Sequence, residues 1–222
     1  MASPQHFYTK LTVRELSKKK KGQNKKELSF LKMMLSKKSH ILDLGCGYGR
    51  LTIPLKKEGF NIEGIDITPY MIKKAKELAK RKNLKIKFKI GDMKNLPYKN
   101  DSFDTIICMW SVFMEVSNRK DQIKTLSEMK RILKTGGFSL IDLPPPYRIG
   151  KRINDTKKGD KSKVGKDRIL RGKISNISFP PAYSHNKKSL TSLMRKSKIK
   201  KFEIYNKNFF GINRLILKFW KS

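Results

Sequence analysis

The middle of the chain alternates between short apolar runs and segments whose apolar residues recur at helical spacing. Runs rich in Ile, Leu and Phe that are bounded by Gly, Asp or Pro predict buried strands. The predicted strands are residues 41–44, 61–66, 85–90, 103–109 and 138–143. Apolar residues three and four positions apart predict helices between these strands. The predicted helices are residues 50–58, 69–79 and 118–135.

The two ends of the chain differ from its middle. Residues 1–40 combine a lysine run at 18–21 with apolar residues at helical spacing, which predicts a basic N-terminal cap segment. Residues 148–182 show no clear periodicity and are dense in Lys, Arg, Gly and Ser, which predicts a basic insertion or lid. Residues 183–222 predict a helix and a hairpin that complete the sheet. We expect one domain overall, with residues 41–147 as its cofactor-binding core.

The stretch from Ile41 to Arg50 carries the strongest chemical signal. An apolar strand holds Asp43 near its end, opens into glycines at alternate positions, and gives way to a helix start. Strand, tight turn and helix start are typical of a nucleotide-type cofactor site. The Asp43 carboxylate would repel a diphosphate, since two unit charges ~4 Å apart interact by about 4 kcal/mol at an effective dielectric of ~20. It favours a positively charged cofactor such as S-adenosylmethionine.

These residues resemble the first motif of the class I S-adenosylmethionine-dependent methyltransferases, in the broad group that includes quinone-biosynthesis and some tRNA methyltransferases. The later segments that match the family's order are residues 62–67, 90–93, 96–98, 103–107 and 131–137. The resemblance covers roughly residues 40–147 and is specific to the cofactor, not to the substrate. It implies an α/β, Rossmann-like sheet of seven mostly parallel strands, with an antiparallel last strand and helices on both faces.

The resemblance and the spacing together assign the cofactor contacts. Asp66 lies 21 positions after Gly45, at a strand end, where an acid can accept hydrogen bonds from both ribose hydroxyls. By resemblance, Asp92 accepts from the adenine amino group and Met93 lies beside the ring; the alternative for each acid is a structural role. Asp104, at a strand start, is expected to be structural. The expected cofactor-binding residues are Asp43, Gly45, Cys46, Gly47, Gly49, Asp66, Ile67, Asp92, Met93 and Cys108.

The acceptor side of the site gives weaker signals. Trp110 either walls a methyl-transfer pocket or simply packs. Tyr147 ends a Pro-Pro-Pro-Tyr run after the fifth strand, and a rigid turn is the alternative to a substrate contact. His185 is either a base or a cap or surface histidine. Many relatives have histidines after the fourth strand, where this chain has Phe113 and Met114, so we assign no catalytic base.

The chain is strongly basic, with 53 Lys and Arg against 18 Asp and Glu and a net charge of +35. Residues 1–40 carry +9 and residues 148–222 carry +18, whereas residues 41–147 carry only +8. A polyanionic partner, RNA first and an anionic membrane surface second, explains that placement. A lysine-rich genome is the alternative. A hot habitat is disfavoured, because it usually raises Glu along with Lys.

Several classes of protein are disfavoured. The chain has no apolar run of 18 or more residues, so we expect no transmembrane helix. Its start lacks the apolar centre of a secretion signal, so we expect a cytoplasmic protein. Cys46 and Cys108 lack a metal-ligand spacing, which predicts buried thiols in a reducing compartment and no metal.

Two functions from different classes follow. The first is methyl transfer to an unidentified acceptor, which is RNA or another polyanion, or a small molecule or quinone-like lipid. Displacement at a sulfonium gains as much as ~7 to 11 kcal/mol from positioning, so it needs a base only when the acceptor is a poor nucleophile. The second is a nucleic-acid-binding protein that keeps the cofactor fold without turnover. The intact glycines and the acids at 43, 66 and 92 favour the enzyme.

Overall fold

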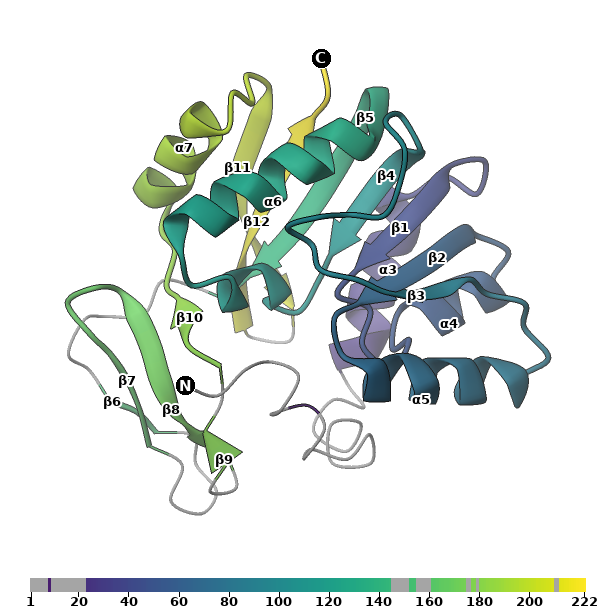
Figure 1. The fold of residues 1–222 in the computed structure, drawn as a ribbon, viewed down its shortest axis with the longest axis horizontal. Coiled ribbons are helices and arrows are strands. Elements are labelled where there is room, and N and C mark those ends of the chain that lie inside the picture. Colours follow the sequence, from purple (N-terminus) through teal and green to yellow (C-terminus); the bar gives the residue numbers. More distant parts are fainter. Residues whose placement is uncertain are drawn as a thin grey trace.

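The computed structural model describes residues 8, 23–144, 152–154, 161–174, 177–178, 180–209 and 212–222. Its main sheet has seven strands: β1 His40–Leu44, β2 Asn61–Asp66, β3 Phe88–Ile90, β4 Phe103–Cys108, β5 Leu133–Leu143, β11 Phe202–Phe209 and β12 Ile212–Trp220. Their order is β11-β12-β5-β4-β1-β2-β3 (Figure 1). All neighbours from β5 to β3 are parallel, and β12 is antiparallel to both β5 and β11. The predicted sheet is confirmed.

Helices cover both faces of this sheet because consecutive strand residues point to opposite sides. The helices are α3 Gln23–Met34, α4 Thr52–Lys57, α5 Pro69–Lys80, α6 Arg119–Ile132 and α7 Lys187–Lys196. Leu42 packs in the apolar cluster under α6 and α7, whereas its neighbour Ile41 packs in the cluster under α3 and α4. On α5, Ile72 and Ala75 pack against Phe88 of β3. Because helices cover both faces of the sheet, polar side chains gather at the ends of its strands.

Part of the predicted basic insertion forms a second, antiparallel sheet. Its strands are β6 Arg152–Asn154, β7 Lys161–Val164, β8 Ile169–Ile174, β9 Ile177–Ser178 and β10 Ala182–Tyr183. Leu170 and Ala182 attach it to the main body, because they join the same apolar cluster as Phe113 and Leu190. Figure 1 shows this small sheet at the lower left, beside the end of β5. The second sheet therefore lies next to the segment that follows β4.

Three predicted boundaries shift. The strand expected from residue 85 begins at Phe88, and the helix expected to end at Gly136 ends at Ile132. β5 then starts at once, because Leu133 pairs with Phe103 and a bulge precedes the next pair. The two strands approach closely beside the bulge, where only glycine fits: a Cβ on Gly137 would lie 2.7 Å from the Asp104 carbonyl oxygen.

Asp104 has the structural role predicted for it. Its carboxylate accepts a hydrogen bond of 2.7 Å from the His40 amide and lies 3.0 Å from the Lys134 ammonium group. Asp104 therefore ties the amino end of β1 to β5, on the edge of the sheet opposite the glycine turn.

Candidate functional site

The loop after β1 depends on glycine. Gly45 has φ +76°, which is unfavourable for other residues, and a Cβ there would lie 2.4 Å from a methyl carbon of Val112, so a side chain would force Val112 or the loop to move. Its amide donates to the Ile65 carbonyl of β2 at 2.8 Å, which fixes the loop to the neighbouring strand. Gly47 has φ +53°, and no atom of the described residues lies within 4 Å of where its Cβ would stand. Among the described residues, the loop is thus closely packed at Gly45 and uncovered at Gly47.

Asp66 lies at the end of β2 and faces this loop. One carboxylate oxygen accepts from the Gly47 amide at 2.9 Å and the other from the Thr68 amide at 2.8 Å. Burial raises the pKa of Asp66, and the two amide hydrogen bonds oppose that rise. A carboxylate has about four acceptor positions, so about two remain for the hydroxyl groups of a ribose. The residue present therefore fits the predicted cofactor. Thr68 is the N-cap residue of α5 and Pro69 follows it at the first helical position, although the Thr68 hydroxyl makes no cap hydrogen bond.

Asp43 lies beneath the loop and faces α4. Only 3% of it is exposed, and it accepts a hydrogen bond of 2.6 Å from the Thr52 hydroxyl. Burial raises the pKa of Asp43 to about 6, against the opposing effects of Thr52 and Arg50. Its charge acts on the loop from below, and the structure shows no exposed carboxylate at this position.

Asp92 follows β3 on the same edge of the sheet. The Lys94 amide donates to it at 2.9 Å, and the Lys94 ammonium group lies 3.5 Å from its other oxygen. The Gly91 amide donates to the Asp66 carbonyl at 3.0 Å, which brings the two acids to adjacent strand ends. Met93 is partly buried against the main apolar cluster. The acids at 66 and 92 are therefore neighbours, as the cofactor prediction requires.

Two residues after β4 adopt a left-handed backbone. Trp110 has φ +62° and Ser111 has φ +66°, which is unfavourable for residues other than glycine. The fully buried Asp142 of β5 holds them: its carboxylate accepts from the Trp110 amide at 2.9 Å, and its carbonyl accepts from the Ser111 amide at 3.1 Å. Arg214 of β12 donates twice to the same carboxylate, at 2.8 and 2.7 Å, and to the Ser111 hydroxyl at 2.5 Å.

Arg50, which stands where a dinucleotide site has its third glycine, joins three parts of the molecule. Its guanidinium donates to Asn24 at 2.8 Å and pairs with Glu27, and both partners lie on α3. The guanidinium carbon also lies 4.8 Å from the centre of the Trp110 ring, within the range of a cation–π interaction. Arg50 thus connects the glycine loop, the N-terminal helix and the turn after β4.

Glu115 is a titratable group at this edge that the sequence analysis did not select. It ends the short 3-10 helix η1 Val112–Glu115, and the Tyr8 hydroxyl donates a hydrogen bond to its carboxylate. Burial raises the pKa of Glu115 to about 7; the Tyr8 hydrogen bond lowers it and the charge of Asp66 raises it further. The signal in the sequence was an acid two positions beyond Phe113, in the turn where histidines were expected.

Two other residues, His185 and Tyr147, were candidates for the substrate pocket. His185 precedes α7, whose N-cap is Asn186, and it is only 3% exposed, so a surface position is wrong. Burial lowers the pKa of His185 to about 3, which leaves a neutral and weakly basic ring near Phe113 and Tyr183. Tyr147 lies outside the described residues.

The remaining predicted cofactor residues lie where the strands end. The Cys46 and Cys108 thiols are buried, and burial raises the pKa of each. Ile67 is partly buried just after β2. Gly49 lies in the turn before α4, which begins at Thr52. The structure thus brings all ten predicted cofactor residues to the carboxyl ends of β1 to β4.

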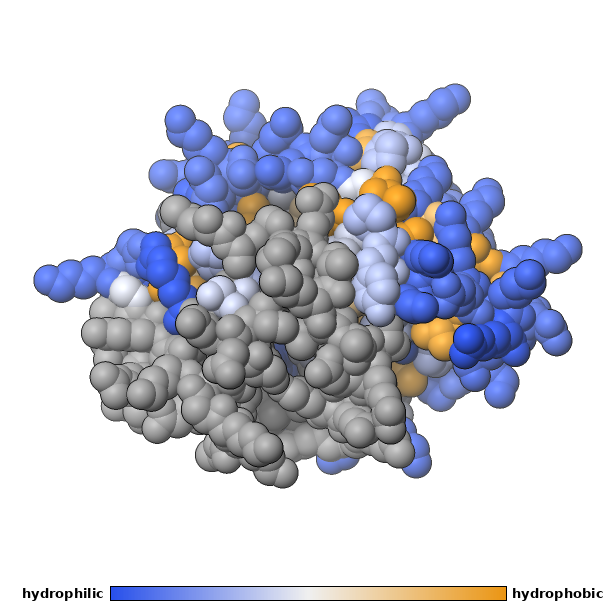
Figure 2. Space-filling view, turned by 60° about the horizontal axis from the view of Figure 1, so that its bottom comes forward, coloured by the Kyte–Doolittle hydropathy of each residue, from blue (hydrophilic) through white to orange (hydrophobic). Residues whose placement is uncertain are grey.

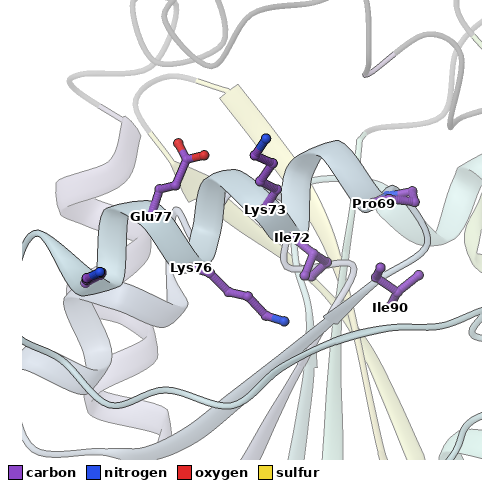
Figure 3. Close-up of a pocket in the computed structure, with 7 residues that line it drawn as sticks. Pro69, Ile72, Lys73, Lys76, Glu77 and Ile90 are labelled. Carbon is purple, nitrogen blue, oxygen red and sulfur yellow. The ribbon is translucent and has the colours of Figure 1, made fainter.

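A groove lies on the surface between α5 and β3. It is lined by Pro69, Ile72, Lys73, Lys76, Glu77, Lys80 and Ile90. In Figure 3, Ile72 and Ile90 point toward one another beside Pro69. None of the ten predicted cofactor residues lines the groove. It is therefore a separate feature of the surface.

The described surface is strongly hydrophilic. Figure 2 shows polar side chains over most of the described part of one face, with hydrophobic residues scattered among them. Exposed cations follow one another along α5 and the segment before β3: Lys73, Lys76, Lys80, Arg81, Lys82, Lys85, Lys87 and Lys89. Within the described ranges, none of the helices is long and apolar enough to span a membrane.

Comparison with known proteins agrees with this geometry. Residues 41–137 match the family model described as a methyltransferase domain. Residues 41–137 belong to this family of methyltransferase domains. A similar relative is a demethylmenaquinone methyltransferase from Deinococcus radiodurans, 37% identical over 48% of the chain and 44% of the relative. Another is a norajmaline N-methyltransferase from Rauvolfia serpentina, 31% identical over 58% of the chain and 43% of the relative.

The fold of the methyltransferase is also found among solved structures. A SAM-dependent methyltransferase from Methanosarcina mazei superposes with a TM-score of 0.69 at 21% identity, over 86% of this chain and 96% of the other. The sequence matches to the curated relatives are shorter, and they span less than half the length of the two relatives named above.

Proposed function

We propose that this chain transfers the methyl group of S-adenosylmethionine to a small-molecule acceptor of the quinol or amine type. The observation that carries the proposal is the meeting of three features at one edge: the loop that the described residues leave uncovered at Gly47, the Asp66 carboxylate that faces this loop, and the turn at Trp110. The names of the matched relatives, a demethylmenaquinone methyltransferase and a norajmaline N-methyltransferase, support the acceptor class.

The residues divide the work of binding. Asp66 accepts from the ribose hydroxyls and Asp92 from the adenine amino group. The ionised form of Asp43 adds negative charge beneath the loop, which favours a cationic ligand over a diphosphate. When bound, S-adenosylmethionine supplies a methyl group activated by a positively charged sulfur. The chain contributes mainly by holding the acceptor in line with that methyl group.

The test is methyl transfer from S-adenosylmethionine labelled on its methyl group. The purified chain is incubated with 1,4-naphthohydroquinone, with a secondary amine such as N-methylbenzylamine, and with total RNA. Label in either small molecule supports the proposal. Label in RNA alone, or in none of the three while the cofactor binds, overturns it. The matched control is Asp66→Asn, which should lose cofactor binding and label together, because its side chain carries no charge toward the ribose.

A second candidate is a polyanionic partner such as RNA. It is favoured by the row of exposed cations along α5 and the segment before β3, from Lys73 to Lys89, and by the net charge of +35. When lysines and arginines bind to RNA phosphates, counterions are released, so the affinity for RNA would fall steeply between 50 and 200 mM salt. Filter binding of labelled RNA over that range is the test, and a flat salt dependence would exclude the partner.

A further inference from the structure

The element that follows β4 packs against the cofactor loop. Its first residue, Val112, has a methyl carbon 2.4 Å from where a Cβ of Gly45 would stand, so η1 and the loop are in contact. The left-handed residues Trp110 and Ser111 turn the chain into η1, and Asp142 holds them there. The last residue of η1 is therefore fixed in position relative to the loop.

Glu115 is the residue at that end. Its carboxylate accepts a hydrogen bond from the Tyr8 hydroxyl and lies within electrostatic range of Asp66, the predicted ribose ligand. Its charge also acts on the Cys108 thiol at the end of β4. These effects place the Glu115 carboxylate near the carboxyl ends of β2 and β4, on the same edge of the sheet as the loop.

Other elements packed on η1 bring little opposing charge. On β5, the Asp142 carboxylate is paired with Arg214. On the side of β10, the ring of His185 is neutral, and Tyr183 lies next to it. Among the described residues, the ionisable groups that act on Glu115 are thus Tyr8, Asp66 and Cys108.

Resting on the proposed function, we propose that Glu115 is the catalytic base that takes the proton from the methyl acceptor. The acceptor atom forms a bond to the methyl carbon, the carbon–sulfur bond breaks, and its electron pair stays on sulfur. The proton released by the acceptor passes to the Glu115 carboxylate and then to solvent. Tyr8 is a positioning residue, because its hydroxyl orients that carboxylate.

The environment suits this role at neutral pH. Burial raises the pKa of Glu115 to about 7, and a base is most effective when its pKa lies near the working pH. The active form is the carboxylate, so the rate rises with pH through about 7 and then levels off. An acceptor hydroxyl of the phenol type has a pKa near 10 and does not titrate in that range.

The test compares pH profiles of methyl transfer to 1,4-naphthohydroquinone, measured anaerobically from pH 5.5 to 8.5. The rate of methyl transfer by the wild type should level off above about pH 7.5. Glu115→Gln keeps an oxygen that can accept from Tyr8 but cannot take a proton, so it should lose about 10²-fold in kcat at pH 8 and also lose the levelling. Tyr8→Phe should keep the levelling and shift its midpoint to higher pH, since the Tyr8 hydrogen bond lowers the pKa of Glu115.

Two controls separate the possible failures. Binding of S-adenosylhomocysteine to Glu115→Gln, measured by calorimetry, should match wild type; a loss of binding would make Glu115 a cofactor ligand and overturn the inference. Glu58→Gln, a half-exposed acid paired with Lys32 at the end of α4, should behave as wild type. If wild type transfers methyl groups and Glu115→Gln does so equally well, the inference fails while the proposed function stands. If wild type methylates neither the naphthohydroquinone nor the amine, both fail.

Discussion

Removing the Arg214 side chain tests whether the buried pair holds the turn after β4. Asp142 has no exposed surface, and the Arg214 side chain is 15% exposed. Arg214→Gln leaves the Asp142 charge buried without its cation. Breaking a buried pair from one side costs about 3 to 5 kcal/mol of unfolding free energy. For a chain of this size that corresponds to a drop of roughly 6 to 20 °C in the melting temperature.

The assay is thermal and urea unfolding followed by circular dichroism, together with calorimetric binding of S-adenosylhomocysteine. Asp142→Asn in the Arg214→Gln background should recover part of the loss, because it removes the unpaired charge and keeps an acceptor for the Trp110 amide. The matched control is Arg171→Gln, since Arg171 pairs with Asp167 on the surface, where ion pairs contribute little.

The cofactor readout adds a second test. Loss of the pair frees the left-handed residues Trp110 and Ser111, so the affinity for S-adenosylhomocysteine should fall even at temperatures where Arg214→Gln remains folded. The reasoning is refuted if Arg214→Gln is no less stable than Arg171→Gln. It is also refuted if the double variant is less stable than Arg214→Gln alone.

Three further predictions follow from the site. Asp66→Asn should weaken S-adenosylhomocysteine binding about 10- to 100-fold in calorimetry, since hydrogen bonds to a charged group are worth about 1.5 to 3 kcal/mol each; unchanged affinity would remove Asp66 from the site. Gly45→Ala should lower the unfolding free energy by roughly 1 to 3 kcal/mol and abolish binding, because the backbone is left-handed there and the new methyl group meets Val112; wild-type stability would show that the loop can move. The pKa of Asp43 is raised to about 6 by burial, so between about pH 4 and 6 the folded state binds more protons than the unfolded chain and the unfolding free energy falls as pH rises. Asp43→Asn should make that fall smaller in urea titrations, while the raised pKa values of Glu115 and Asp66 maintain the rest of it; parallel curves for the two proteins would contradict the prediction.

Much of the fold could be predicted because apolar runs and glycines act locally. The strand at 61–66 matches β2 residue for residue, since a buried strand bounded by turns needs no distant information. The second sheet was missed for the opposite reason. Strands such as Lys161–Val164 and Arg152–Asn154 carry charged residues, and their pairing partners lie elsewhere in the insertion. Periodicity cannot detect a strand whose partners decide its register.

The site divides in the same way. Asp66 at the end of β2 was found by spacing and Asp92 after β3 by resemblance, whereas Asp142 and Arg214 are 72 positions apart and meet only when β12 pairs with β5. An acid inside the apolar run of residues 138–143 was a signal, since a buried carboxylate requires a partner. The sequence did not say which of its many cations supplies it.

The position of Arg214 late in the chain also affects how the protein folds during synthesis. Residues 41–137, which hold the glycine loop and both cofactor acids, leave the ribosome well before β12 does. Until β12 inserts beside β5, Asp142 lacks its cation and the residues after β4 lack their restraint. A nascent chain that stalls, or one that a protease cleaves before residue 214, would therefore have a nearly complete Rossmann-like core in which the turn after β4 is not held in place.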